Sequence, residues 1–231
     1  MKWVTPCSKP CRVFFIRTYH TVYSFFIFVE IAAMSTKAER TTRYIIETVA
    51  PIFNKHGYVG TSMSDLTDAT GLTKGALYGN FENKEALALA AFEYNSTRLL
   101  TTLEETLAIE GTALDKIFAL TDFYRHYDDF TMEMGGCPIL NTGVDAEHNN
   151  RLLAAAVRET VGIIEGKIAL VLENGVKANE IRLPVTPLQF AKQLYTMLQG
   201  AVAMATLSRD RKYLINTVAY LDVLINREIK K

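Results

Sequence analysis

The chain has 231 residues, of which 49% are hydrophobic, with only 13 Gly and 6 Pro. This composition supports one or two hydrophobic cores and excludes wholesale disorder. Its 25 basic and 25 acidic residues cancel at neutral pH, which argues against a protein that coats nucleic acid through bulk positive charge. The three cysteines, Cys7, Cys11 and Cys137, form no Cys-x-x-Cys pair and no Cys/His metal framework. We therefore expect a cytoplasmic protein without a metal ion or other cofactor.

Residues 1–33 differ from the rest of the chain. Their aromatic and β-branched run, residues 13–29, partly matches a secretory signal, because basic residues precede it and Ala32 and Ala33 follow it. The longest uncharged stretch, residues 18–29, is too short for a membrane span. Met34 begins a segment typical of a cytosolic N-terminus, so we interpret residues 1–33 as a non-native start or a disordered extension. Without them the chain has 21 basic and 24 acidic residues. A regulator tethered to a membrane by residues 1–33 is the alternative.

The first predicted helix covers residues 37–56, because its apolar residues recur at helical spacing. These are Ile45, Ile46, Val49, Ile52 and Phe53. His56 and Gly57 provide the stop signal. Pro51 lies inside the pattern, where it removes one backbone hydrogen bond and should bend the helix.

Two short helices are expected next. Thr61 or Ser62 can cap the first, whose buried face would contain Met63, Leu66 and Ala69. Gly71 then supplies a turn, and Thr73 can cap a third helix, residues 74–81. This is the arrangement of a helix-turn-helix, in which small residues on the second helix allow its backbone to approach DNA bases. The alternative is an ordinary three-helix bundle, which local charge favours: residues 35–94 hold six Lys and Arg against seven acidic residues.

A specific motif decides between these two interpretations. The run Gly57-Tyr58-x-x-Thr61-Ser62-Met63-x-Asp65-Leu66, followed by Ala69-x-Gly71-Leu72-Thr73-Lys74-Gly75-Ala76-Leu77-Tyr78-x-Asn80-Phe81-x-Asn83-Lys84-Glu85-Ala86-Leu87, closely resembles the tetracycline-repressor (TetR/AcrR) family. The resemblance implies a DNA-binding transcriptional regulator, with the DNA-binding domain at residues 34–82. It places eight residues at double-stranded DNA: Thr61, Ser62, Thr73, Lys74, Gly75, Tyr78, Asn80 and Lys84. Asn80 departs from the His of many family members.

The remaining residues, 83–231, are expected to form a larger helical ligand-binding and dimerisation domain. Helical periodicity predicts helices at 83–109, 112–130, 148–178, 186–208 and 210–229, with a weak signal for a short helix near 139–144. The last two carry apolar faces that would bury against other helices. The resemblance implies that they form a homodimer, and two DNA-binding helices one DNA turn apart would match a palindromic operator.

The ligand site is the least specified part of the sequence. Aromatic and Met residues at helical spacing usually form a core, but the resemblance implies that several line a cavity for a small apolar or aromatic effector. The candidates are Phe118, Phe123, Tyr124, Tyr127, Met134, Cys137 and Met197. The loop Gly135-Gly136-Cys137-Pro138 resembles a Gly-Cys-Pro loop in a subset of the family, some of whose members sense electrophiles through a cysteine in that region. An electrophile- or redox-responsive repressor acting through Cys137 is therefore an alternative to a packed, inert thiol in the pocket wall.

No sequence feature favours an enzyme. The chain contains no nucleophile–base pattern, no phosphate-binding loop and no Gly-rich dinucleotide signature. The acidic and histidine groups at 126–129 and 145–148 are typical of solvated surface and predict no metal site. We therefore expect a repressor that releases DNA when a ligand entering between the helices moves the helix at 83–109.

Overall fold

The computed structural model describes residues 36–229, so the interpretation of residues 1–33 lies outside the described part of the chain. The prediction of an all-α fold is confirmed: ten α-helices and one 3-10 helix account for most of the described residues. The elements are α2 (Lys37–Gly60), α3 (Met63–Thr70), α4 (Lys74–Asn80), α5 (Lys84–Leu107), α6 (Ala113–Arg125), α7 (Tyr127–Thr131), η1 (Met132–Met134), α8 (Pro138–Asn149), α9 (Arg151–Lys177), α10 (Pro187–Ser208) and α11 (Lys212–Glu228).

Helix α2 begins at a capping box. The Thr36 hydroxyl accepts from the Glu39 N–H, and the Glu39 carboxylate accepts from the Thr36 N–H, which satisfies two backbone donors that the helix start would leave free. The helix continues through Pro51, and its backbone leaves the helical region at Gly57, where φ is +75°. The interruption therefore coincides with the predicted stop, whereas Pro51 does not end the helix.

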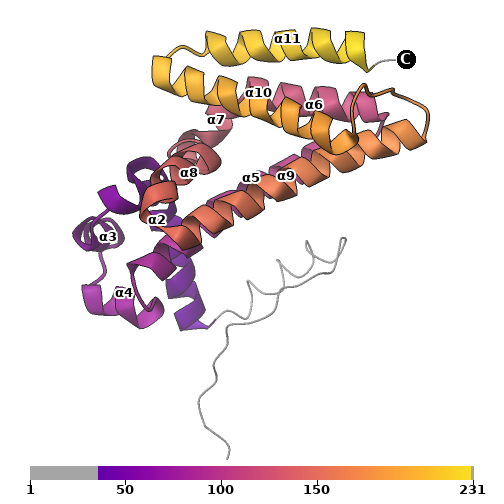
Figure 1. Cartoon of the computed structure of the whole chain (residues 1–231). Coiled ribbons are helices and arrows are strands. Elements are labelled where there is room, and N and C mark those ends of the chain that lie inside the picture. Colours follow the sequence, from indigo (N-terminus) through magenta and orange to yellow (C-terminus); the bar gives the residue numbers. More distant parts are fainter. Residues whose placement is uncertain (1–35, 230–231) are drawn as a thin grey trace, which may run out of the picture.

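Helices α3 and α4 form the predicted helix-turn-helix. Ser62 caps α3 in a capping box with Asp65, and Thr73 caps α4 by accepting from the Ala76 N–H. Gly71 joins the two helices with a φ of +66°, a conformation that glycine adopts without steric cost. The three helices α2 to α4 lie at one end of the molecule (Figure 1).

The long helices α5 and α9 extend from this end to the opposite end, where α6, α10 and α11 pack together (Figure 1). A single cluster of buried apolar residues runs through all of these helices. The predicted apolar faces of α10 and α11 are buried within the chain, since Leu198 and Val218 have no exposed surface. Among the described residues, no helix combines the length and apolar character that crossing a membrane requires.

Two boundaries differ from the predictions. The helix predicted at 112–130 is divided at His126 into α6 and α7; there the Arg125 carbonyl accepts from the Arg211 guanidinium, and Arg211 also forms ion pairs with the first turn of α7. The weak signal at 139–144 corresponds to a helix of 12 residues, α8, which Cys137 caps and Pro138 begins. Proline is favoured at that position because its missing N–H is not needed there.

Candidate DNA interface and ligand site

Helix α4 buries one apolar residue against the domain and presents most of its other residues to solvent. Leu77 is 1% exposed, whereas Thr73, Lys74, Gly75, Tyr78 and Gly79 are all exposed. The Lys74 ammonium lies 5.8 Å from the centre of the Tyr78 ring, within the range of a cation–π interaction.

The two glycines of α4 face open space. A Cβ at Gly79 would meet no other group within 4 Å, and one at Gly75 would only approach the Thr73 hydroxyl at 3.9 Å. Packing therefore does not require glycine at either position. Their small size instead lets another molecule approach the backbone of α4 closely, which DNA recognition in the major groove needs.

Two of the predicted DNA contacts have a different place in the structure. The Thr61 side chain is 1% exposed and its hydroxyl donates to the Gly57 carbonyl at 2.7 Å, so it cannot reach DNA in this conformation. The Asn80 amide joins α4 to α2, since its oxygen accepts from the Thr42 hydroxyl at 2.7 Å and its nitrogen donates to the Ala76 carbonyl at 2.9 Å. These two residues position the helices of the helix-turn-helix, while Ser62 remains exposed.

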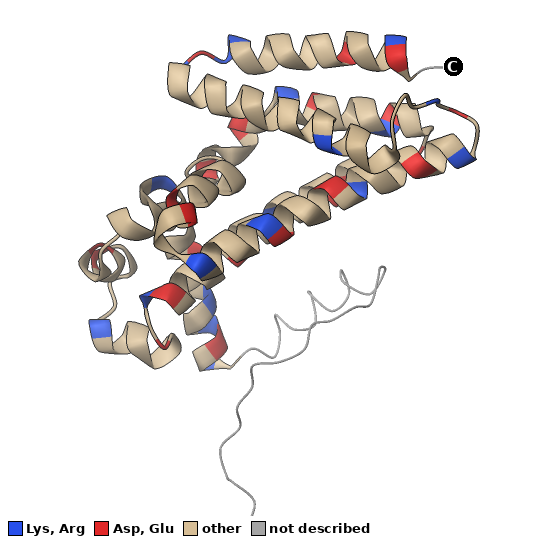
Figure 2. Cartoon of the chain, in the orientation of Figure 1, with Lys and Arg blue, Asp and Glu red and all other residues tan. Residues whose placement is uncertain are grey.

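Lys84, at the start of α5, is only partly exposed. Its ammonium lies 4.5 Å from the centre of the Tyr58 ring. Burial lowers the pKa of Lys84, and the nearby carboxylates of Asp145 and Asp65 oppose this shift. Figure 2 shows few basic segments along α3 and α4, where Lys74 is the only Lys or Arg. DNA binding at this surface would therefore depend on a few placed groups and backbone N–H donors.

Hydrogen bonds connect α2 to the larger domain. The buried Asn54 amide nitrogen donates to the carbonyls of Met134 and Gly136 at 2.6 and 2.7 Å. Beyond the break in α2, the Tyr58 N–H donates to the Asp145 carboxylate at 2.6 Å. The loop between η1 and α8 is therefore fixed directly to the first helix of the DNA-binding domain.

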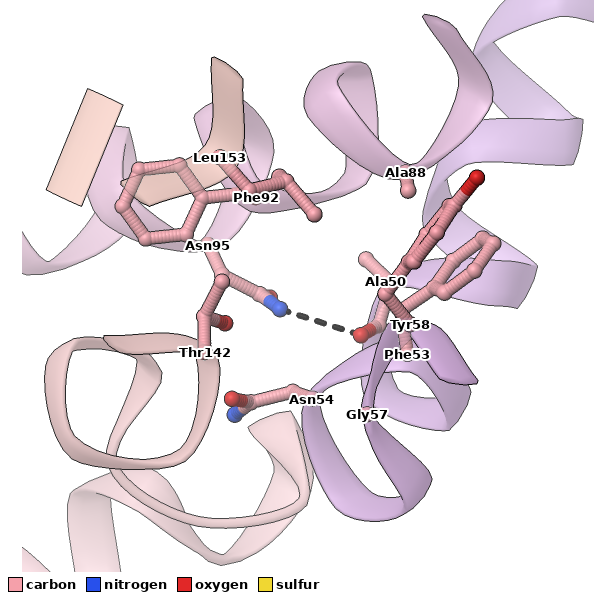
Figure 3. A pocket seen from close by; sticks show the side chains of 10 residues that line it. All are labelled: Ala50, Phe53, Asn54, Gly57, Tyr58, Ala88, Phe92, Asn95, Thr142 and Leu153. Atoms are coloured by element: carbon pink, nitrogen blue, oxygen red, sulfur yellow. Dashed lines mark hydrogen bonds between the residues drawn. The ribbon is translucent and has the colours of Figure 1, made fainter. Parts of the chain in front are cut away.

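A cavity of about 10 Å³ lies at this junction, between α2, α5, α8 and α9 (Figure 3). The Asn95 amide nitrogen donates across it to the Ala50 carbonyl at 3.1 Å. The side-chain oxygens of Asn54 and Asn95 are buried and have no hydrogen-bond partner among the described residues. The cavity has about the volume of a single water molecule.

The aromatic residues predicted to line the ligand site pack mainly against one another. The rings of Tyr124 and Tyr127 are stacked with centres 4.8 Å apart, and Phe123 contacts both edge to face at 5.4 and 5.6 Å. Tyr124, Tyr127 and Met134 are at most 1% exposed. Phe118 and Met197 are partly buried against the same core.

A larger cavity of about 270 Å³ lies beside this cluster, and two predicted ligand residues, Tyr127 and Cys137, line it. The Tyr127 hydroxyl donates to the Cys137 sulfur at 3.2 Å, and the thiol lies 3.7 Å from the Gln199 side-chain oxygen. Burial raises the pKa of the Cys137 thiol. The sulfur is therefore held in its neutral form, which is a poor nucleophile.

Two family models and a full-length relative match this chain, and all three describe transcriptional regulators. Residues 45–91 match the model of bacterial regulatory proteins of the tetR family, and residues 113–221 match the tetracyclin repressor-like C-terminal domain. The chain is 26% identical to the HTH-type transcriptional repressor NemR of Escherichia coli K12, over 83% of this chain and 98% of that protein.

Solved structures of TetR regulators share the fold. A regulator from Cytophaga hutchinsonii is 34% identical, covering 86% of this chain and all of its own, with a TM-score of 0.79. One from Chloroflexus aurantiacus is 32% identical, covering 84% of this chain and 98% of its own, also with a TM-score of 0.79.

Proposed function

The chain belongs to the tetR family of bacterial regulatory proteins, and from this premise we propose that it is a ligand-released repressor that binds a palindromic operator as a dimer. Its role as a DNA-binding transcriptional repressor follows from the family and from relatives that are repressors. The dimeric operator complex, the release by ligand and a cytoplasmic location are the further parts of the proposal.

The open face of α4 is the observation that carries the DNA-binding part. Gly75 and Gly79 leave its backbone accessible, and Lys74 and Tyr78 project beside them. Ser62 and Thr73 lie at the starts of α3 and α4, where backbone N–H groups are available to phosphate. In this proposal Ser62, Thr73, Tyr78 and the partly exposed Lys84 contact phosphates, while Lys74 and Gly75 lie nearest the bases.

An exposed apolar surface supports the dimer. The inner faces of α10 and α11 are already buried, yet large apolar residues remain exposed on their outer faces. They are Leu188, Met204, Leu207, Tyr213, Ile215, Tyr220 and Val223. We name this set the α10–α11 outer surface. Large apolar residues left exposed on two adjacent helices are typical of a protein interface.

Two connections would carry the ligand signal to α4. Helix α5 begins three residues after Phe81 and packs extensively on α2. The loop that includes Gly136 and Cys137 lines the 270 Å³ cavity and is bonded to Asn54 of α2. A ligand that binds more tightly when this loop has moved would favour a state with altered spacing between the two copies of α4.

The experiment measures the anisotropy of labelled DNA from upstream of the chain's own coding sequence, titrated with protein at several salt concentrations. We expect a dimer to bind one palindromic site. Two copies of Lys74 and Lys84 predict a slope of log K against log salt of about −4 or shallower. A slope near −10 would contradict binding through a few placed groups, and the absence of a specific site would contradict the proposal.

A further inference from the structure

The 270 Å³ cavity lies between α7, the loop after η1 and the C-terminal end of α10. Six residues from these elements form its wall: Tyr127, Thr131, Cys137, Val202, Ala205 and Thr206. The first four are buried, Ala205 is half-buried and Thr206 is exposed. A cavity of about 150 Å³ is sufficient for benzene. This one therefore has room for a single substituted ring.

The polar side chains of this wall have already used their hydrogens. Thr131 donates its hydroxyl hydrogen to the Tyr127 carbonyl at 2.9 Å, and Thr206 donates to the Val202 carbonyl at 2.9 Å. The Tyr127 hydroxyl donates to the Cys137 sulfur. A hydroxyl has one hydrogen and two lone pairs. These three hydroxyls therefore have no further hydrogen to donate and offer acceptor lone pairs.

The thiol and the neighbouring amide extend the same pattern. The Cys137 thiol is directed to the Gln199 oxygen, while the Gln199 nitrogen donates to the Tyr124 hydroxyl at 3.3 Å. Burial raises the pKa values of the Cys137, Tyr124 and Tyr127 side chains. The whole network is therefore uncharged at neutral pH.

The ionised residues that line the cavity, Asp128, Arg209 and Arg211, lie at its rim. Arg211 forms ion pairs with Asp128 and Asp129 at 3.0 and 2.9 Å, and Arg209, the second arginine of the rim, is exposed to solvent. Asp129 itself does not line the cavity. Arg211 is neutralised by its carboxylate partners, Arg209 faces solvent, and the buried part of the wall carries no ionised group to favour a charged ligand. A charged group moved inward from this rim would lose its hydration and find no counter-charge.

We propose that this cavity is the effector site and that it selects a small neutral ring carrying a hydrogen-bond donor, such as a phenol or an aniline. The inference rests on the proposed function only where it makes the bound ring an effector that releases DNA; the binding of the ring itself does not depend on that function. The ligand supplies the hydrogen that the wall lacks, donating to the buried Thr131 hydroxyl oxygen while its ring fills the space beside Val202 and Ala205.

Four ring probes test this selection by direct titration of the full chain at pH 7 without DNA. Phenol is neutral and donates, anisole is neutral and only accepts, benzoate is an anion, and benzylammonium is a cation. We expect phenol to bind at least about tenfold more tightly than each of the others, a difference of about 1.4 kcal/mol.

Two variants locate the site. Thr131→Val keeps the side-chain shape but removes the hydroxyl, and should reduce the preference for phenol over anisole to less than about threefold. Thr160→Val is the matched control, because Thr160 is also buried and bonded to its own helix but lies on α9, away from the cavity wall. Ala205→Leu, at a half-buried position, should fill the cavity and abolish phenol binding.

Equal affinity for phenol and anisole would overturn the donor requirement, and tighter binding of benzoate or benzylammonium would overturn the selection for a neutral ligand. No binding of any probe, or binding unaffected by Ala205→Leu, would overturn the site. Operator binding is measured separately on the same protein without any probe. Loss of the ligand inference is therefore distinguishable from failure of the proposed repressor function.

Discussion

Asn54 illustrates how a single side chain links the two domains. It is 3% exposed, and its amide nitrogen donates to the carbonyls of Met134, at the end of η1, and of Gly136, in the loop between η1 and α8. Its own backbone carbonyl accepts from the Asn141 amide at 3.0 Å. Because both hydrogens of the Asn54 amide nitrogen are used, the loop and α2 are fixed relative to each other at this residue.

We expect Asn54→Ala to lower the free energy of unfolding by about 2–3 kcal/mol, because it leaves two buried carbonyls without a donor. Chemical denaturation measures the effect. Asn149→Ala is the control, since Asn149 is exposed and bonded only within its own helix, and it should change the same free energy by about 0.5 kcal/mol or less. Equal effects of the two substitutions would contradict the role of Asn54.

The buried Cys137 thiol predicts how stability depends on pH. Burial raises its pKa in the folded state above the ordinary value of 9.0. Below pH 9 the thiol is protonated in both states. Above it, the unfolded state loses the proton first, so the free energy of unfolding should fall by up to about 1.4 kcal/mol per pH unit.

Denaturation between pH 7 and 10.5 measures this dependence. The buried tyrosines Tyr124, Tyr127 and Tyr195 add to the fall above pH 10, because burial raises their pKa values in the same direction. In Cys137→Ala the fall between pH 9 and 10 should be smaller. A fall of the same size in both proteins would show that the thiol is not held protonated by the fold.

Some residues of the DNA-binding surface could be predicted from the sequence and others could not. The exposed positions of α4 follow from helical spacing, because Leu77 marks its buried side. Thr61 and Asn80 are residue types that often contact DNA. In the structure, however, the Thr61 hydroxyl is bonded to the Gly57 carbonyl, and the Asn80 amide is bonded to the Thr42 hydroxyl. The Thr42 contact spans 38 residues, and no local pattern encodes it.

At the scale of elements, the long amphipathic helices and the two short helices of the helix-turn-helix were predictable, whereas the division between α6 and α7 and the full length of α8 were not. Helices α5, α9, α10 and α11 begin and end within a few residues of the predicted limits, because periodicity over many turns is a strong signal. The break at His126 depends on Arg211, which is remote in sequence. Helix α8 was reduced to a weak signal because its capping atom is a cysteine sulfur, which is not among the usual capping groups.

The break in α2 depends on glycine at position 57. Its φ is +75°, and a Cβ there would lie 2.7 Å from the Asp145 side chain, which accepts the Tyr58 N–H. We expect Gly57→Ala to lower the free energy of unfolding by about 2 kcal/mol or more. Thermal unfolding measures this loss. Gly60→Ala is the control and should be nearly neutral, since a Cβ at Gly60 would have its nearest contact at 3.9 Å. Similar losses in both variants would contradict this assignment.

The whole molecule separates its proposed activities between its ends. The helix-turn-helix lies at one end and the α10–α11 outer surface at the other, with α5 and α9 spanning the distance between them (Figure 1). Pairing through the outer surface would set two copies of α4 at a fixed spacing. The DNA-binding segment is slightly acidic overall, so one protomer is expected to bind DNA weakly. A dimer that contacts both halves of an operator is expected to bind it tightly and specifically.

We expect Val223→Glu to weaken dimerisation at least about tenfold, because it places two carboxylates in an apolar interface. Sedimentation at several protein concentrations gives the dimer dissociation constant. Val144→Glu is the matched control: Val144 is 70% exposed on α8 and Val223 is 62% exposed on α11. If only Val144→Glu weakens the dimer, the interface lies elsewhere.

The most direct test of DNA recognition by α4 is the operator affinity of Gly75→Leu, measured by anisotropy beside the unsubstituted chain. A Cβ at this position would meet only the Thr73 hydroxyl, at 3.9 Å, so folding should be unaffected, but the leucine side chain would hold α4 away from the bases. Gly166→Leu makes the same change at an open position of α9 and is the control. We predict at least about a hundredfold loss of affinity for Gly75→Leu and less than about twofold for Gly166→Leu, equivalent to about 2.7 and 0.4 kcal/mol. Operator binding by Gly75→Leu at the affinity of the unsubstituted chain would contradict the assignment of α4 as the DNA-reading helix.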